Sequence, residues 1–134
     1  MYHILEQKIG CTFKNKALLT EALTHRSYIN ENRTHPVPHN ERLEFLGDSI
    51  LGFIVSDFLF ALFPHSDEGT LTEMRSYIVN GESVSKVAEE IGLIEFILFS
   101  RGERESNNSR ARKFIVANCV EAIIGALYKD QGYG

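Results

Sequence analysis

The sequence is short of cysteine and proline, and these shortages narrow the class of protein. Its 134 residues include only two cysteines, Cys11 and Cys119, too few for a disulfide framework. Both lie in apolar surroundings, so we expect reduced, buried thiols in a cytoplasmic protein. The 3 prolines and 10 glycines form no low-complexity tract, and we find no internal repeat. The length predicts one compact domain over residues 1–134.

Targeting segments and long apolar runs are also missing. The N-terminal stretch MYHILEQKIG has no charged segment followed by an apolar run, so we expect no signal peptide. The longest apolar stretch, residues 50–63, is interrupted by Gly52, Ser56 and Asp57. We therefore expect neither a transmembrane span nor a membrane partner.

Positive charge is in deficit as well. The formal net charge is −4, whereas proteins that bind nucleic acids are usually basic. Taken alone, this balance argues against a nucleic-acid-binding protein. The objection weakens if the acids are clustered, because carboxylates that hold a divalent cation reverse their local field once the metal is bound.

What the sequence does contain is helical periodicity, which predicts an all-α domain. The polar stretch 25–39 and the charged stretch 101–110 predict loops. Thr70 and Glu73 have capping-box spacing and predict the start of a helix at Thr70. The predicted helices cover residues 3–9, 14–24, 40–63 with Asn40 as N-cap, 70–79, 82–92 and 112–129.

The helix predicted after Asn40 carries three carboxylates on one narrow face. At about 100° per residue from Glu41, Glu44 falls at roughly 300° and Asp48 at roughly 340°. The opposite side, which we expect in the core, holds Leu43, Leu46, Ile50 and Ile54. A solvated acidic face is the ordinary interpretation of such a cluster. The alternative is a site for a hard cation such as Mg²⁺ or Mn²⁺, which prefers oxygen ligands.

Phe45 lies on the polar side of the same helix, at roughly 40° by this count. Ser49, Gly52 and Ser56 continue its stripe. A large aromatic residue followed by small ones suits a surface that another helix approaches closely. Packing of Phe45 under a loop of its own chain is an equally open alternative.

The segment NERLEFLGDS, residues 40–49, resembles the signature stretch of the ribonuclease III family. Other segments resemble family elements in the same order: LTHRSY at 23–28, EGTLT at 68–72, RSYIVN at 75–80 and EAIIGALY at 121–128. The resemblance therefore extends over essentially the whole chain. We interpret His25, within LTHRSY, as a structural histidine.

The resemblance implies an all-helical catalytic domain that forms a symmetric homodimer and cleaves double-stranded RNA during rRNA and mRNA processing. Each subunit is expected to cut one strand, leaving 5′-phosphate and 3′-hydroxyl ends with short 3′ overhangs. The implied cofactor is Mg²⁺, for which Mn²⁺ can substitute. The family's usual linker and double-stranded-RNA-binding domain are expected to be absent, as in an excised catalytic domain. We expect such a fragment to bind RNA weakly and with strong salt dependence.

The resemblance also implies roles for particular residues. Glu44, Asp48 and Glu121 match metal-binding carboxylates of the family. Glu41 and Glu68 match further acids of the catalytic centre. Phe45 matches a knob that inserts into a socket on the partner subunit, which would place Ser49 and Gly52 at the dimer interface.

The chain departs from the family pattern at Asn118. This position lies three residues before Glu121, and the family usually has an acid there. An amide carbonyl can still ligate Mg²⁺, so we expect Asn118 among the metal ligands, with weakened metal affinity. Three explanations are open: an active natural variant, an engineered substitution that traps a substrate complex, or a dimeric RNA-binding module without catalysis. A helical interaction protein whose acids hold no metal is a further rival.

Overall fold

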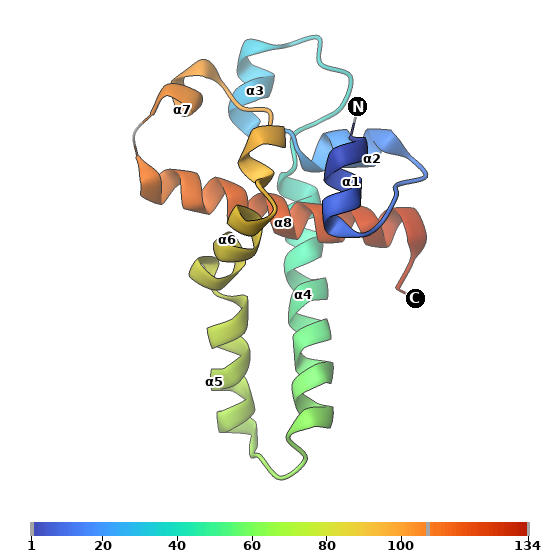
Figure 1. The fold of residues 1–134 in the computed structure, drawn as a ribbon, viewed down its shortest axis with the longest axis vertical. Helices are drawn as coiled ribbons and strands as arrows, with labels where there is room; N and C mark the ends of the chain where they lie inside the picture. The colour runs from blue at the N-terminus through green and yellow to red at the C-terminus, as the bar shows by residue number, and fades with distance from the viewer. Residues whose placement is uncertain (1, 107, 134) are drawn as a thin grey trace.

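The computed structural model describes residues 2–106 and 108–133, and helices dominate both ranges (Figure 1). The elements are α1 (His3–Ile9), α2 (Lys16–Ala22), α3 (Arg26–Glu31), α4 (Glu41–Leu62), α5 (Glu68–Val79), α6 (Gly81–Glu90), the 3₁₀ turn η1 (Leu93–Phe96), α7 (Arg101–Glu105) and α8 (Ser109–Gln131). Within the described ranges, β structure is limited to an isolated parallel bridge between Thr24 and Leu98. The all-α prediction is confirmed.

Helix α8 crosses the molecule, and the other elements are arranged around it (Figure 1). Helices α4 and α5 form a hairpin that projects to one side of α8. The short helices α3 and α7 lie on the other side (Figure 1). Much of the surface of the hairpin therefore lies away from the core.

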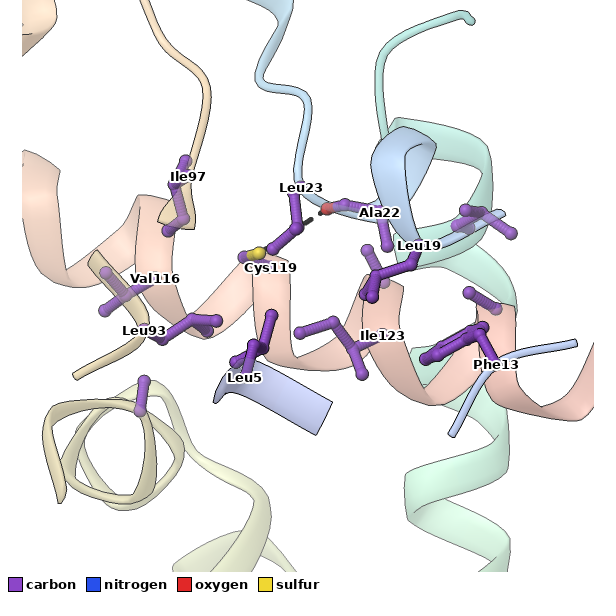
Figure 2. Packing of buried hydrophobic residues seen from close by; sticks show 14 of the residues in the cluster. Leu5, Phe13, Leu19, Ala22, Leu23, Leu93, Ile97, Val116, Cys119 and Ile123 are labelled. Carbon is purple, nitrogen blue, oxygen red and sulfur yellow. Dashed lines mark hydrogen bonds between the residues drawn. The ribbon is translucent and has the colours of Figure 1, made fainter. Parts of the chain in front are cut away.

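The core packs around the middle of α8 (Figure 2). Cys119 is fully buried there, and its thiol donates to the carbonyl of Ala22 with an Sγ–O distance of 3.4 Å. Burial raises the pKa of this thiol. Cys119 therefore matches the prediction of a buried thiol, whereas Cys11 is only half-buried. The fully buried side chains around α8 include Leu5, Leu19, Leu23 and Leu93.

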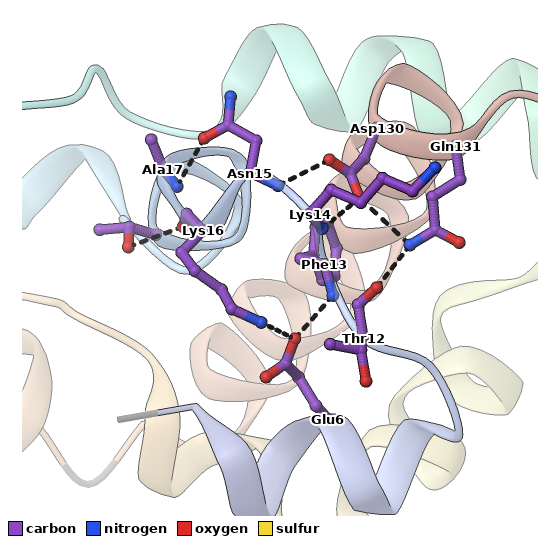
Figure 3. A network of polar contacts seen from close by, with 10 residues as sticks. Glu6, Thr12, Phe13, Lys14, Asn15, Lys16, Ala17, Asp130 and Gln131 are labelled. Carbon is purple, nitrogen blue, oxygen red and sulfur yellow. Dashed lines mark hydrogen bonds and ion pairs between the residues drawn. The ribbon is translucent and has the colours of Figure 1, made fainter.

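A polar network joins the α1–α2 loop to the C-terminal end of α8 (Figure 3). Glu6 is 7% exposed; it accepts from the Phe13 backbone at 2.6 Å and pairs with Lys16 at 2.5 Å. Asp130 accepts from the backbone of Asn15 at 2.9 Å. Since Asn15 is the N-cap of α2, these bonds hold the start of α2 against the end of α8.

Helix caps explain where the predicted boundaries were wrong. Residues 25–39 contain α3, because the His25 side chain accepts from the backbone N–H of Ser27 and caps the helix. Helix α5 begins before Thr70, because Asp67 is the N-cap and accepts from the Thr70 backbone at 2.9 Å.

The charged stretch 101–110 was predicted as a loop, and this prediction was also wrong in part. Ser100 caps α7 by accepting from the backbone of Glu103. Asn108 caps α8 by accepting from Ala111, so α8 begins earlier than the predicted residue 112.

Helix α4 is apolar on more than one face. Leu43 is buried as predicted, but Ile54 is 44% exposed, and Val55 and Leu59 take the core positions instead. By length and composition the helix could cross a membrane, so the interruptions noted in its sequence do not exclude a span. Within the structure, α4 packs along α8 and α5.

Helices α4 and α8 cross in direct backbone contact at Gly47 and Gly125. A Cβ atom on Gly47 would lie 1.6 Å from the carbonyl oxygen of Glu121. A Cβ atom on Gly125 would lie 2.3 Å from the carbonyl oxygen of Leu43. The obstacle on both sides is helix backbone, which cannot rotate away as a side chain can. This crossing therefore requires glycine at both positions.

We predict that Gly47→Ala lowers the free energy of unfolding by about 3 kcal/mol or more, because the added methyl group must separate two packed helices. Urea unfolding measures this change directly. Gly69→Ala is the matched control in α5, where the nearest atom to the new Cβ is Asp67 Oδ1 at 3.7 Å. This control should stay within about 1 kcal/mol of the parent. A Gly47→Ala protein as stable as the control would contradict the assigned crossing.

Candidate active site

The crossing of α4 and α8 brings together acids that lie far apart in the sequence. Glu41, Glu44 and Asp48 extend from the first turns of α4, and Asn118 and Glu121 come from α8. All five line one cavity of about 600 Å³, together with His25, Asn40, Phe45 and Ile115. The predicted carboxylate face of α4 is therefore a wall of this cavity.

The glycine contact accounts for this placement. Gly47 faces α8, and the backbone oxygen opposite it belongs to Glu121. Glu44 lies three residues before Gly47 and Asp48 one residue after it, so both flank the contact. Asn118 and Glu121 are three residues apart on α8 and share one face of that helix.

Burial and mutual repulsion dominate the electrostatics of the cavity. Burial raises the pKa of Glu121 to about 8, and the neighbouring Asp48 and Glu44 carboxylates add to the shift. Burial also raises the pKa of Glu44, with further contributions from the charges of Glu41 and Asp48. Among the described residues, Glu44, Asp48 and Glu121 form no ion pair. The site therefore holds several acids without a compensating protein cation.

Glu41 differs from these three acids. Its side chain is 47% exposed and pairs with Arg26 Nε at 3.0 Å. Arg26 is the first residue of α3, a helix that the sequence did not predict. Arg26 thus holds Glu41 at the edge of the cavity.

Three further lining residues were not expected at the site: Ile115, Asn40 and His25. Asn40 is 5% exposed, and its side-chain amide donates to the Ala22 carbonyl at 2.9 Å, so it joins α4 to α2. His25 caps α3, in agreement with a structural role, but it also lines the cavity. Burial lowers the pKa of His25, which favours the neutral imidazole.

Glu68 is the one candidate acid that the fold leaves away from the cavity. It begins α5, at the end of the hairpin farthest from α8 (Figure 1). Helix α4 has 22 residues, so its cavity end and its hairpin end lie roughly 33 Å apart. Its assignment to the catalytic centre stays a prediction.

Phe45 is 78% exposed beside the cavity. Packing of Phe45 under a loop of its own chain, one of the two alternatives, is therefore wrong. Ser49 is also exposed, and nothing lies within 4 Å of a Cβ built on Gly52. The hairpin exposes further large apolar side chains: Phe53, Phe58, Phe60 and Tyr77.

The donor set of the cavity fits a hard divalent cation. Glu44, Asp48, Glu121 and the carbonyl of Asn118 offer only oxygen, which selects Mg²⁺ or Mn²⁺ over softer metals. Among the described residues, no three His, Cys, Asp or Glu side chains already converge as a metal site. The ligand chemistry therefore fits, but the side chains would have to close around the ion.

These features define a class: helical domains that present a carboxylate site suited to a hard cation. Comparison with known proteins gives the family. Residues 15–134 match the family model described as Ribonuclease-III-like. The chain belongs to the ribonuclease III family.

Individual relatives agree with this assignment. Ribonuclease 3 of Geobacillus sp. (strain WCH70) is 48% identical over 128 residues, which cover 96% of this chain and 52% of the relative. The chain thus spans about half the length of the curated relatives it matches. The nuclease domain of ribonuclease III from Campylobacter jejuni has a TM-score of 0.88 at 39% identity, covering 98% of this chain and 87% of that chain. Dicer from Pichia stipitis has a TM-score of 0.66 at 30% identity, and the match covers 90% of this chain and 49% of the Dicer chain.

We predict that Glu121→Gln makes the metal-free protein less sensitive to alkaline pH. A folded-state pKa of about 8, above the usual 4.5, means that Glu121 stabilises the fold while protonated. This contribution is lost as pH rises between these values, by on the order of 1–2 kcal/mol after allowance for solvent screening. Urea unfolding in EDTA at pH 5 and pH 8.5 measures it. The exposed Glu95→Gln control should behave as the parent, and an equal loss in the parent and Glu121→Gln would refute the shift.

Proposed function

We propose that this chain is the endonuclease domain of a Mg²⁺-dependent, dimeric ribonuclease III acting in the cytoplasm. It hydrolyses phosphodiester bonds of double-stranded RNA during rRNA and mRNA processing. The products carry 5′-phosphate and 3′-hydroxyl ends with short 3′ overhangs. The main support is the cavity in which oxygen ligands from two crossing helices meet, in a chain of this family.

The ribonuclease III family is metal-dependent, and we assign Mg²⁺, with Mn²⁺ as a substitute, from the oxygen-only ligand set. When bound, such a cation polarises phosphoryl oxygens and lowers the pKa of coordinated water. Glu44, Asp48 and Glu121 hold the ion as carboxylates, so each must be ionised. Because the pKa of Glu121 is raised to about 8, a proton competes with the metal for this ligand near neutral pH.

Asn118 determines how strongly the site holds the ion. Its carbonyl can ligate, but it carries no charge where the family usually has an acid. Since affinity for hard cations depends on ligand charge, we propose an active site with weakened metal affinity. The alternative is a dimeric RNA-binding module without catalysis, which the same missing charge favours.

We predict that Asn118→Asp lowers the Mg²⁺ concentration needed for half-maximal cleavage about tenfold or more. Cleavage of a long RNA duplex across a Mg²⁺ titration measures this effect. Asn118→Ala, which removes the carbonyl as well, should move the requirement in the opposite direction. If the parent cleaves at no Mg²⁺ or Mn²⁺ concentration while still binding the duplex, the binding-module alternative replaces the proposed function.

The exposed surface of the α4–α5 hairpin supports the proposed homodimer. Phe45 and Tyr77 are each more than three-quarters exposed, and apolar patches of this kind mark interaction surfaces. The Campylobacter jejuni nuclease domain has a region involved in dimer formation that shows structural flexibility. A dimer would place two acid cavities on one duplex, one for each strand.

We predict that Phe45→Ala weakens self-association about tenfold or more, because a buried aromatic residue at an interface is a typical hot spot. Sedimentation equilibrium across a concentration series measures the dissociation constant. Phe114→Ala is the matched control, since Phe114 is 58% exposed but lies near the start of α8, outside the hairpin. A parent protein that stays monomeric at micromolar concentrations contradicts the dimer.

A further inference from the structure

The hydrogen bonds around His25 determine which ring nitrogen carries its proton. The backbone N–H of Ser27 donates to Nδ1 at 3.2 Å. The Ser27 hydroxyl oxygen lies 2.8 Å from Nδ1 and accepts from the backbone N–H of Ser100 at 2.8 Å. A backbone N–H can only donate, so Nδ1 must be the unprotonated nitrogen. The neutral ring then carries its proton on Nε2.

The Nε2–H group is available to a ligand. Among the described residues, Nε2 of His25 makes no hydrogen bond. Every fully buried side-chain nitrogen or oxygen in that part of the chain does have a hydrogen-bond partner, so Nε2 cannot be one of the fully buried atoms. The Nε2 atom is therefore accessible to solvent. His25 is half-buried and lines the acid cavity, so the accessible Nε2 atom belongs to a residue in the cavity wall.

The backbone holds His25 rigidly in this position. Its N–H donates to the Leu98 carbonyl at 2.8 Å, and its carbonyl accepts from Tyr28 at 3.0 Å. The N–H of Leu98 donates to the Leu23 carbonyl at 2.8 Å. The two bonds made by Leu98 belong to the bridge between residues 24 and 98. A donor fixed in this way loses little conformational entropy when it binds a substrate.

The other polar side chains of the cavity are mainly acceptors. Ionised Glu44, Asp48 and Glu121 can only accept hydrogen bonds, and the Asn40 amide already donates to the Ala22 carbonyl. The Asn118 amide is a further neutral donor in the lining, on the same side chain as the carbonyl assigned to the ion. RNA presents anionic and hydroxyl oxygens along its backbone. A neutral donor can bind such an oxygen without repelling a cation held by the nearby carboxylates.

We propose that His25 donates a hydrogen bond from Nε2 to an acceptor oxygen of the RNA sugar–phosphate backbone beside the scissile bond. This substrate contact rests on the proposed function. It assigns His25 two roles on two nitrogens: Nδ1 caps α3 and Nε2 binds RNA. Because the roles use different atoms, they can be separated by mutation.

The experiment compares His25→Asn with His25→Gln. Asparagine places an acceptor near the position of Nδ1 and is a good N-cap, but its side chain is too short to reproduce Nε2. Glutamine can place an amide N–H near the position of Nε2, but it caps helices poorly. Thermal unfolding follows the cap, whereas duplex binding and single-turnover cleavage follow the RNA contact.

We expect His25→Asn to keep the parent's thermal stability and to weaken duplex binding or single-turnover cleavage about 10-fold to 100-fold. We expect His25→Gln to recover most of that loss even if it unfolds more easily. A purely structural histidine gives the reverse order, with asparagine active and glutamine impaired. That order overturns the proposal.

Modified duplexes identify the acceptor and supply a second check. A methylphosphonate moved along the positions beside the scissile bond tests phosphate oxygens, and a 2′-deoxy substitution tests the ribose hydroxyl. At the contacted position, the change that removes the acceptor oxygen should weaken the parent and leave His25→Asn unaffected. Equal losses in both proteins at every position overturn the proposal.

The outcomes separate this inference from the proposed function. If the parent cleaves RNA and His25→Asn matches it, the His25 contact alone is wrong. If the parent binds RNA without cleaving it, the proposed function is wrong, and the binding series still tests His25. A parent that neither binds nor cleaves duplex RNA overturns both.

Discussion

The backbone contact between Gly47 of α4 and Gly125 of α8 is the constraint on which the rest of the structure depends. Helices separated by side chains usually pack 8–10 Å apart, as a typical interaxial range. Here a methyl group on either glycine would collide with the opposite backbone, so the helices touch without intervening side chains. That contact places Glu44 and Asp48 opposite Glu121, and it directs the rest of α4 away from the core as part of the hairpin.

A close approach of several carboxylates carries an electrostatic cost. The raised pKa values of Glu44 and Glu121 express this cost, since burial and neighbouring negative charge both disfavour ionisation. A divalent cation bound at the proposed site would relieve the repulsion, and metal binding would then be coupled to the stability of the crossing. Asn118 lowers both the repulsion among the acids and the affinity for a metal, because the site has one negative charge fewer than with an acid at this position.

Features that depend on local periodicity could be predicted from the sequence. The helix over residues 3–9 and the carboxylate face of α4 follow from counting 100° per residue. Features that depend on distant backbone groups could not. Residues 25–39 contain prolines and polar side chains, so α3 was missed. The hydrogen bonds that hold His25 and Ser27 in place involve Leu98 and Ser100, which local patterns cannot connect to them.

The candidate site shows the same division. The acids of α4 were recognisable as a cluster from their spacing, whereas only the family resemblance linked them to Glu121. Gly47 and Gly125 stood within the matched segments, but their role needs the partner helix to be seen. The distance of Glu68 from the cavity likewise depends on the length of the α4–α5 hairpin.

Thermal unfolding across a Mg²⁺ titration tests most directly whether the glycine crossing builds a metal site from α4 and α8. A metal that binds only the folded state raises the melting temperature by mass action. The parent melting temperature should rise with Mg²⁺ concentration, and that of a Glu44→Gln, Asp48→Asn double variant should stay nearly constant. An equal rise in both proteins, or none in the parent, would contradict the account.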